Sequence, residues 1–262
     1  MRFSFMSFSA PELDFAQTLE AAKRYGYDGF EPRLESGHAH GVEIGISATQ
    51  IREFRQAAED NGVAVCCLAT GCKFADPAAA SAMREKALRA VELASALGCP
   101  AIRVFGGAIP DGGAREKSFD SIVETLLEIA GPAQAAGVTV CMETHDAWCD
   151  PFAVADIMQA VDKPSVAVNW DIMHPVLRAG YPVAIAFDIL RPWIRHVHLH
   201  DGRMDAGKLT LLPVGEGDID HAAALRLLKA DGYGGYASGE WINWEPWQTH
   251  LPRELKTLKS LL

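Results

Sequence analysis

Short apolar segments recur along the chain, and the stretches between them have the periodicity of helices. In residues 118–131 the apolar positions follow the three-, four-, seven- and eight-residue spacing of one buried helical face. Several expected helices end at a glycine, which adopts the left-handed conformation of a helix end without strain. These glycines are Gly26, Gly62, Gly98, Gly137 and Gly232. The expected strands begin near Arg2, Asp28, Val63, Ala101, Val138, Ser165, Ile194 and Gly235.

This alternation of strand and helix predicts a parallel sheet, because each return of the chain to such a sheet needs a crossover helix. Eight units in 262 residues match one (β/α)8 barrel, which typically has about 250 residues. No linker-like stretch divides the chain, so we predict a single-domain (β/α)8 TIM barrel over residues 1–262. A doubly wound open sheet is the alternative, but no Gly-x-Gly-x-x-Gly motif follows the first strand.

Composition and charge indicate which kinds of molecule the protein binds. The chain has 49% hydrophobic and 22% charged residues, and its net charge of −10 disfavours nucleic-acid binding through a basic surface. No apolar run reaches the roughly 20 residues of a membrane span, and the N-terminus is too short for a signal sequence. Six cysteines without a Cys-x-x-Cys pair suggest reduced thiols. We therefore expect a cytoplasmic protein with a small-molecule partner, and a homo-oligomer is possible.

Polar side chains gather where the expected strands end. Residues two apart in a strand point the same way, so His196, His198 and His200 share one face of the seventh strand. In a barrel, functional side chains come from the C-terminal ends of the strands and the loops that follow. The candidates at these ends are Glu31, Glu143, His145, Asp146, Asp171, His198, His200, Asp201 and Glu240. Most of them place a site on the side of strands 5 to 8.

Four of these residues, Glu143, Asp171, His198 and Glu240, would bring three carboxylates and one imidazole into one pocket. Two carboxylates about 4 Å apart repel by about 4 kcal/mol at an effective dielectric constant of 20, and a divalent cation turns this repulsion into binding. Oxygen-rich ligation with one histidine favours Mn²⁺, with Mg²⁺, Co²⁺ or Zn²⁺ as alternatives. We predict one divalent metal ion with positions open to substrate oxygens.

Other candidates each have two interpretations. Asp171 could also cap the helix that follows it. His174, three residues later, is predicted to face the substrate, with a hydrogen bond to the backbone as the alternative. Glu31 is a candidate for substrate binding, or for an ion pair with Arg33 or Arg103.

Two more candidates for substrate contact lie farther along the chain. Trp148 is predicted to wall the pocket, with apolar packing as the alternative. Arg203 is predicted to contact substrate after the seventh strand, with exposure to solvent as the alternative. The segment Gly215–Asp218 is acidic, which argues against a phosphate at that position.

Five motifs in order give the chain a family resemblance. They are Met142-Glu143-Thr144-His145-Asp146, Asn169-Trp170-Asp171-Ile172-Met173-His174-Pro175, His196-Val197-His198-Leu199-His200-Asp201, Gly215-Glu216-Gly217-Asp218-Ile219-Asp220 and Gly239-Glu240-Trp241. Over essentially its whole length the chain resembles the xylose-isomerase-like (β/α)8 barrels, a superfamily of sugar-phosphate isomerases and epimerases that also contains endonuclease IV. Each motif alone is weak, but all five in this order with one barrel spacing are specific.

The resemblance implies roles for the candidate residues. In epimerases of the superfamily a Glu-Asp-His-Glu set binds one divalent metal, which implies Glu143, Asp171, His198 and Glu240 here. The two glutamates there also move protons on opposite faces of the substrate, and the histidine of Asp-x-x-His, here His174, touches a substrate oxygen. The implied activity is isomerisation or epimerisation of a sugar, keto-sugar or inositol-type substrate through a metal-stabilised enediolate.

The segment after Glu143 departs from the family pattern. Ketose 3-epimerases continue there with Pro-(Leu/Ile)-Asn-Arg, whereas this chain has Thr144-His145-Asp146-Ala147. The local substrate contacts therefore differ, and His145 is a candidate for one of them.

Three other functions are weighed against the isomerase. A lyase or dehydratase would start from the same carbanion and expel a leaving group. A non-catalytic sugar-binding barrel is compatible with the fold, because fold does not determine function. An endonuclease is disfavoured by the negative charge, and also because the expected ends of strands 3 and 4, Ala69-Thr70-Gly71 and Phe105-Gly106-Gly107, lack the extra zinc-binding histidines of endonuclease IV.

Overall fold

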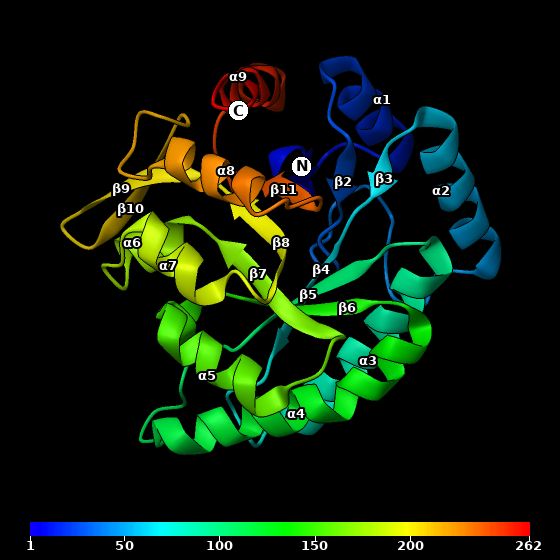
Figure 1. Cartoon of the computed structure of the whole chain (residues 1–262). Helices are drawn as coiled ribbons and strands as arrows, with labels where there is room; N and C mark the ends of the chain where they lie inside the picture. Colours follow the sequence, from blue (N-terminus) through cyan, green and yellow to red (C-terminus); the bar gives the residue numbers. More distant parts are fainter.

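Parallel strands form the centre of the protein, and helices surround them (Figure 1). The computed structural model describes residues 1–262. The strands of the central sheet are β1 (Arg2–Met6), β2 (Gly29–Glu31), β3 (Ala64–Val65), β4 (Leu68–Lys73), β5 (Ala101–Phe105), β6 (Thr139–Glu143), β7 (Val166–Asp171), β8 (Ile194–Leu199) and β11 (Tyr236–Gly239). Eight of these begin at or within one residue of the expected positions, and β4 begins inside the segment expected as one strand from Val63. The predicted order of strands is therefore confirmed.

The sheet closes on itself as a barrel. Its order is β3-β2-β1-β11-β8-β7-β6-β5-β4, and every neighbouring pair is parallel. The two end strands, β3 and β4, are successive parts of one chain segment interrupted at Cys66 and Cys67. The amide of Leu34 donates to the carbonyl of Ala69 at 2.9 Å, and this bond joins the segment after β2 to β4. Counted as one strand, β3 and β4 complete an eight-stranded ring, so the (β/α)8 prediction is confirmed.

Several helices begin or end at residues that cap them. Asp14 with Gln17 and Ser47 with Gln50 form capping boxes at the starts of α1 and α2. Four of the expected glycines, at positions 26, 62, 98 and 137, take the left-handed conformation directly after a helix. The helices are α1 (Phe15–Tyr25), α2 (Ala48–Asn61), α3 (Ala80–Leu97), α4 (Arg115–Ala136), α5 (Pro151–Val161), α6 (Met173–Leu177), α7 (Val183–Leu190), α8 (His221–Ala230) and α9 (Trp247–Ser260), with short 3-10 helices η1 (Ser7–Ser9) and η2 (Asp146–Trp148).

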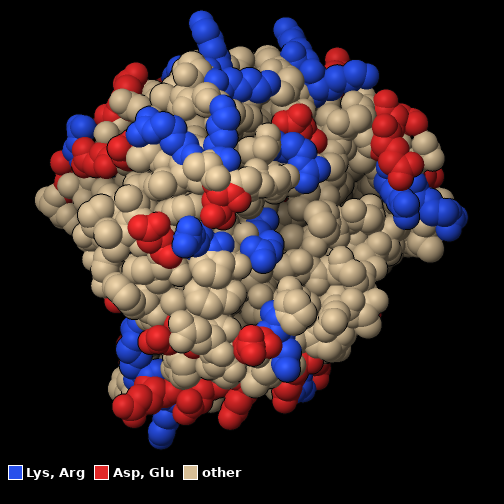
Figure 2. All heavy atoms as spheres, in the orientation of Figure 1, with Lys and Arg blue, Asp and Glu red and all other residues tan.

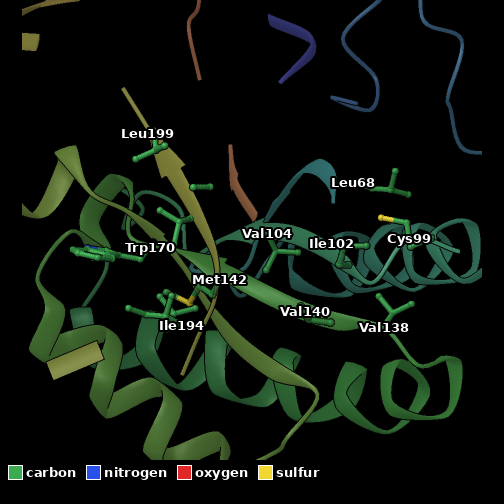
Figure 3. Close-up of a cluster of buried hydrophobic side chains, with 14 of the residues drawn as sticks. Leu68, Cys99, Ile102, Val104, Val138, Val140, Met142, Trp170, Ile194 and Leu199 are labelled. Carbon is green, nitrogen blue, oxygen red and sulfur yellow. The ribbon is translucent and has the colours of Figure 1, made fainter. Parts of the chain in front are cut away.

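Alternation along the strands separates the core from the interior of the barrel. On β6, Val140 and Met142 belong to the large apolar cluster shown in Figure 3, whereas Cys141 does not. Trp170 of β7 points to the helices, where its ring centroid lies 5.8 Å from that of Phe187 on α7. The residues between these apolar positions therefore face into the barrel, and Glu143 is one of them.

A hairpin that sequence reasoning did not predict follows β8. Strands β9 (Asp201–Asp205) and β10 (Lys208–Leu212) pair antiparallel with each other and stay outside the barrel sheet. The turn between them has positive φ at both Ala206 and Gly207. The hairpin lies at one side of the molecule in Figure 1.

Two features bear on the expectations from composition. All six cysteines are free and buried, which agrees with the predicted reduced thiols. None of the helices combines the length and apolar character that a membrane span requires. On the face shown in Figure 2, Lys and Arg side chains are interspersed with Asp and Glu side chains.

Candidate metal centre and active site

The four predicted metal ligands converge at one end of the barrel. Glu143 and Asp171 are the last residues of β6 and β7, His198 lies near the end of β8, and Glu240 directly follows β11. One potential ligand atom from each lies within 4.8 Å of the others, and all four residues are buried. His198 is central, with Nδ1 3.5 Å from Oε1 of Glu143 and 3.2 Å from Oε2 of Glu240. The structure therefore brings the predicted set together.

The electrostatics of this set favour a positive charge at its centre. Oε1 of Glu143 and Nδ1 of His198 are buried without a hydrogen bond, which is costly for polar groups unless they bind another partner. Burial opposes protonation of His198, but Glu31, Glu143 and Glu240 together raise its pKa well above the usual value. Three carboxylates and one free imidazole nitrogen fit a divalent cation such as Mn²⁺ or Mg²⁺.

Glu31 lies below this set rather than at its open side. Nε2 of His196 donates to one carboxylate oxygen at 2.8 Å, and Nε2 of His198 donates to the other at 3.1 Å. Burial alone would raise the pKa of Glu31, but His198 and His196 hold it well below the usual value. Glu31 pairs with neither Arg33 nor Arg103, so that alternative is wrong. Because Nε2 of His198 donates to Glu31, its Nδ1 is left free to bind a cation.

Asp171 combines the two roles considered for it. Its Oδ1 accepts hydrogen bonds from the amides of Met173 at 2.8 Å and His174 at 3.2 Å, and these bonds hold the first turn of α6. Its Oδ2 accepts from Nε2 of His200 at 2.8 Å. Burial opposes the charge on His200, yet Asp171 raises the pKa of that imidazole to about 9. The hydrogen bonds from the backbone thus orient the carboxylate of Asp171, which is also one of the four predicted metal ligands.

His174 and His145 stand together beside Glu143. Their ring centroids are 4.3 Å apart, and ligand atoms of Glu143, His145 and His174 lie within 4.8 Å of one another. Nδ1 of His145 is 3.0 Å from Asp146, and Nε2 of His174 is 3.7 Å from Asp171. Both predicted substrate-facing histidines are therefore next to the candidate metal centre.

Two other predicted contacts lie elsewhere. Trp148 is completely buried against the backbone of Gly106, where a Cβ would come within 2.3 Å of its ring. This is the packing role given as the alternative. Arg203 is exposed on β9, with Nε 3.1 Å from Oδ1 of Asp218, so the structure does not bring it into the four-residue set.

Arg103 was missed as a site residue. It is completely buried on β5, with Nε 2.9 Å from Oε2 of Glu143. Its Nη1 donates to the carbonyl of Thr70 at 2.7 Å, and its guanidinium lies 4.0 Å above the ring of Phe105. The signal in the sequence is one charged residue within the apolar run Ala-Ile-Arg-Val-Phe, because a buried cation needs a partner.

Comparison with known proteins assigns the family. Residues 19–261 match the model of the family described as xylose isomerase-like TIM barrel. The chain belongs to this family. The resemblance noted in its five motifs is therefore confirmed.

Individual members of the xylose isomerase-like family are more distant. The chain is similar to the 2-oxo-tetronate isomerase of Pectobacterium atrosepticum, with 23% identity over 60% of this chain and 64% of that protein. It is also similar to the “Putative hydroxypyruvate isomerase” of Mus musculus, with 28% identity over 63% of this chain and 62% of that protein. The matches thus span less than two thirds of the length of these relatives. Among solved structures, the probable 3-DHS dehydratase AsbF of Bacillus anthracis superimposes with a TM-score of 0.83, 21% identity and 99% of each chain covered.

Proposed function

We propose that this protein is a divalent-metal-dependent isomerase or epimerase that acts on a sugar or a related hydroxy-carbonyl compound. The observation that carries the proposal is the convergence of Glu143, Asp171, His198 and Glu240, with Oε1 of Glu143 and Nδ1 of His198 buried without a hydrogen bond. The relatives named as isomerases support the reaction class. A cytoplasmic location is part of the same proposal.

The four residues would hold the metal ion. A divalent cation bound there would act as a Lewis acid toward substrate oxygens and would make the neighbouring carbon more acidic. The rest of the chemistry falls to side chains of the chain itself.

Glu143 and Glu240 are assigned the proton transfers. They approach Nδ1 of His198 from β6 and from the end of β11, so they flank the place where substrate would bind. Burial opposes ionisation of Glu240, but His198 lowers the pKa of its carboxyl to about 2. Glu240 is thus ionised at neutral pH and able to accept a proton, while Arg103 restrains Glu143 through Oε2. His174 and His145 are assigned to bind substrate oxygens.

Deuterium exchange tests these roles. In D₂O with Mn²⁺, the protein should incorporate deuterium into a 2-keto sugar or 2-keto acid at the carbon that loses its proton. We expect Glu143→Gln and Glu240→Gln each to lower the exchange rate by about 10²–10⁴-fold. The exposed Glu59, which pairs with Arg55 on α2, provides the control Glu59→Gln. Full activity in both site variants would refute the assignment.

A lyase or dehydratase is the second candidate. The dehydratase of Bacillus anthracis has the same fold, and elimination begins with the same loss of a proton. Mass spectrometry of the product separates the two reactions. An isomerase leaves the substrate mass unchanged in H₂O, whereas elimination removes water or another leaving group.

A further inference from the structure

Arg33 is a half-buried cation without an acidic partner. It lies two residues beyond the end of β2, and its Nη1 donates to the carbonyls of Leu34 at 2.5 Å and Ala69 at 3.4 Å. No carboxylate oxygen lies within 4.0 Å of its guanidinium. The buried Arg103, in contrast, has the carboxylate of Glu143 beside it. A guanidinium that is partly removed from water with only carbonyl partners keeps donors and charge available for an anion.

The position of Arg33 is at the same end of the barrel as the candidate metal centre. A Cβ on Gly71 would lie 3.0 Å from its Nη2, and Arg103 donates to the carbonyl of the adjacent Thr70. The two guanidiniums therefore approach successive residues of β4. Only β1 separates β2 from β11, so the strand that precedes Arg33 is about 10 Å from the one that precedes Glu240.

The far side of the barrel mouth carries the histidines. In the order of the ring, β2 lies opposite β7, and His174 follows β7. A substrate held at the four-residue set would thus have imidazoles on one side and Arg33 on the other. Such a substrate is held by different groups at its two ends.

The nearby acidic side chains have other partners. Oε2 of Glu240, the first of them, lies 3.2 Å from Nδ1 of His198. The carboxylate oxygens of Glu43 accept hydrogen bonds from the amide of Glu35 at 2.9 and 2.7 Å, and the carboxylate of Glu35 contacts Lys86. Burial and the neighbouring Arg103 lower the pKa of Arg33 to about 10, so the guanidinium is still charged at neutral pH. Its charge is therefore left for a ligand.

We propose that Arg33 binds a carboxylate of the substrate, so that the protein acts on short hydroxy-keto acids rather than on neutral sugars. The planar guanidinium matches a carboxylate through paired hydrogen bonds, and one cation balances its single charge. This inference rests on the proposed isomerase function and specifies its substrate class. The names of the two isomerase relatives also denote acids.

Calorimetric titration with D-glycerate and with glycerol tests the proposal without turnover. The two probes share two hydroxyl groups, and glycerate has a carboxylate where glycerol has its third hydroxyl group. For the Mn²⁺-loaded protein we expect tighter binding of glycerate, and Arg33→Gln should weaken it about ten- to a hundredfold while leaving glycerol unchanged. Arg33→Lys should lie between the two, because it keeps the charge and loses the paired donors. Arg55→Gln, on the exposed surface of α2, is the matched control.

Other results of the titration would contradict the carboxylate site or the proposed isomerase function. Equal binding of glycerate by the wild type and Arg33→Gln, with both folded by circular dichroism, overturns the inference. So does a wild-type protein that fails to prefer glycerate over glycerol, or that binds glycerol 3-phosphate more tightly than glycerate. If glycerate binding depends on Arg33 but no keto substrate exchanges a proton, the carboxylate site stands and the proposed isomerase function fails.

Discussion

Single carboxylates at this site hold several partners at once. Glu31 accepts from two histidines, and Asp171 accepts from two amides and from His200. In each case the buried charge is balanced by oriented donors rather than by solvent, which fixes the direction of the side chains around it. The orientation of His198 is therefore determined by a residue more than 160 positions earlier in the chain.

Substitution of Glu31 tests this control of His198. Glu31→Gln removes the negative charge that holds Nε2–H, so we expect the dissociation constant for Mn²⁺ to rise about ten- to a hundredfold. Manganese affinity is measured by titration, and the ring-nitrogen shifts of His198 in the metal-free protein report its tautomer by NMR. Glu43→Gln is the matched control, because the carboxylate of Glu43 accepts its hydrogen bonds from the backbone amide of Glu35 and from no histidine. Unchanged affinity and tautomer would show that Glu31 does not orient the ligand.

His40, which is not one of the four candidate metal ligands, should make the stability of the protein depend on pH. Its buried ring accepts the amide of Val42 at Nδ1, and burial, with a contribution from His38, lowers its pKa from 6.5 to about 4. Below pH 6.5 the unfolded chain binds a proton that the folded protein excludes, so stability falls as the pH drops toward 4. Between pH 7.5 and 5 this costs about 2 kcal/mol. In urea unfolding, the stability lost between pH 7.5 and 5 should be about 2 kcal/mol smaller in His40→Asn, which keeps an acceptor, than in the wild type; equal losses would contradict it.

At the scale of elements, the regular alternation of the chain made the barrel predictable. The strand starts and helix ends depend on local periodicity and on glycines, which the sequence displays directly. The break between β3 and β4 and the β9–β10 hairpin do not depend on such a pattern. The hairpin packs outside the barrel, so its residues lack the apolar alternation of a buried strand, and only Ala206-Gly207 marks its turn.

Asp201 anchors this hairpin to the barrel. Its buried carboxylate accepts hydrogen bonds from the amides of Gly202, Gly215, Gly217 and Ile219 at 2.8 to 3.3 Å. Asp201→Ala would leave these donors without their acceptor.

We expect that substitution to lower the free energy of unfolding by about 3 kcal/mol. Trypsin should then cleave the native protein faster after Arg203 or Lys208, which are exposed on the hairpin. The exposed Asp205 supplies the control Asp205→Ala. Resistance to trypsin equal to that of the wild type would show that other contacts hold the hairpin.

At the scale of the whole molecule, the site depends on contacts between distant segments. Its ligands could be proposed from the sequence because a barrel gathers the ends of its strands, and the four residues do converge. The ion pair between Arg103 and Glu143 could not be predicted from the sequence. It depends on the register of β5 and β6, which aligns Phe105 with Glu143. Arg203 is exposed on the hairpin and pairs with Asp218, which corresponds to the alternative given for it in the sequence analysis.

Metal binding should stabilise the entire barrel, because its four ligands come from four strands. At a free Mn²⁺ concentration 100 times the dissociation constant, binding adds about 2.7 kcal/mol, which raises the melting temperature by about 5–10 °C. Differential scanning calorimetry with and without EDTA measures the shift. Asp171→Asn should reduce it strongly, whereas Asp188→Asn, on the exposed face of α7, should not. A melting temperature that ignores Mn²⁺ would argue against a metal site.

The opposite end of the barrel is closed by its own side chains. Cys66, Cys67, Cys141 and Ala167 cluster there with Tyr236, and Arg2 lies over that ring at 3.9 Å. These side chains fill the interior of the barrel at the end where the strands begin. Under the proposed function, the metal ion, the substrate and the product would therefore all enter and leave through the open end of the barrel, and the outermost of them would control the release of the others.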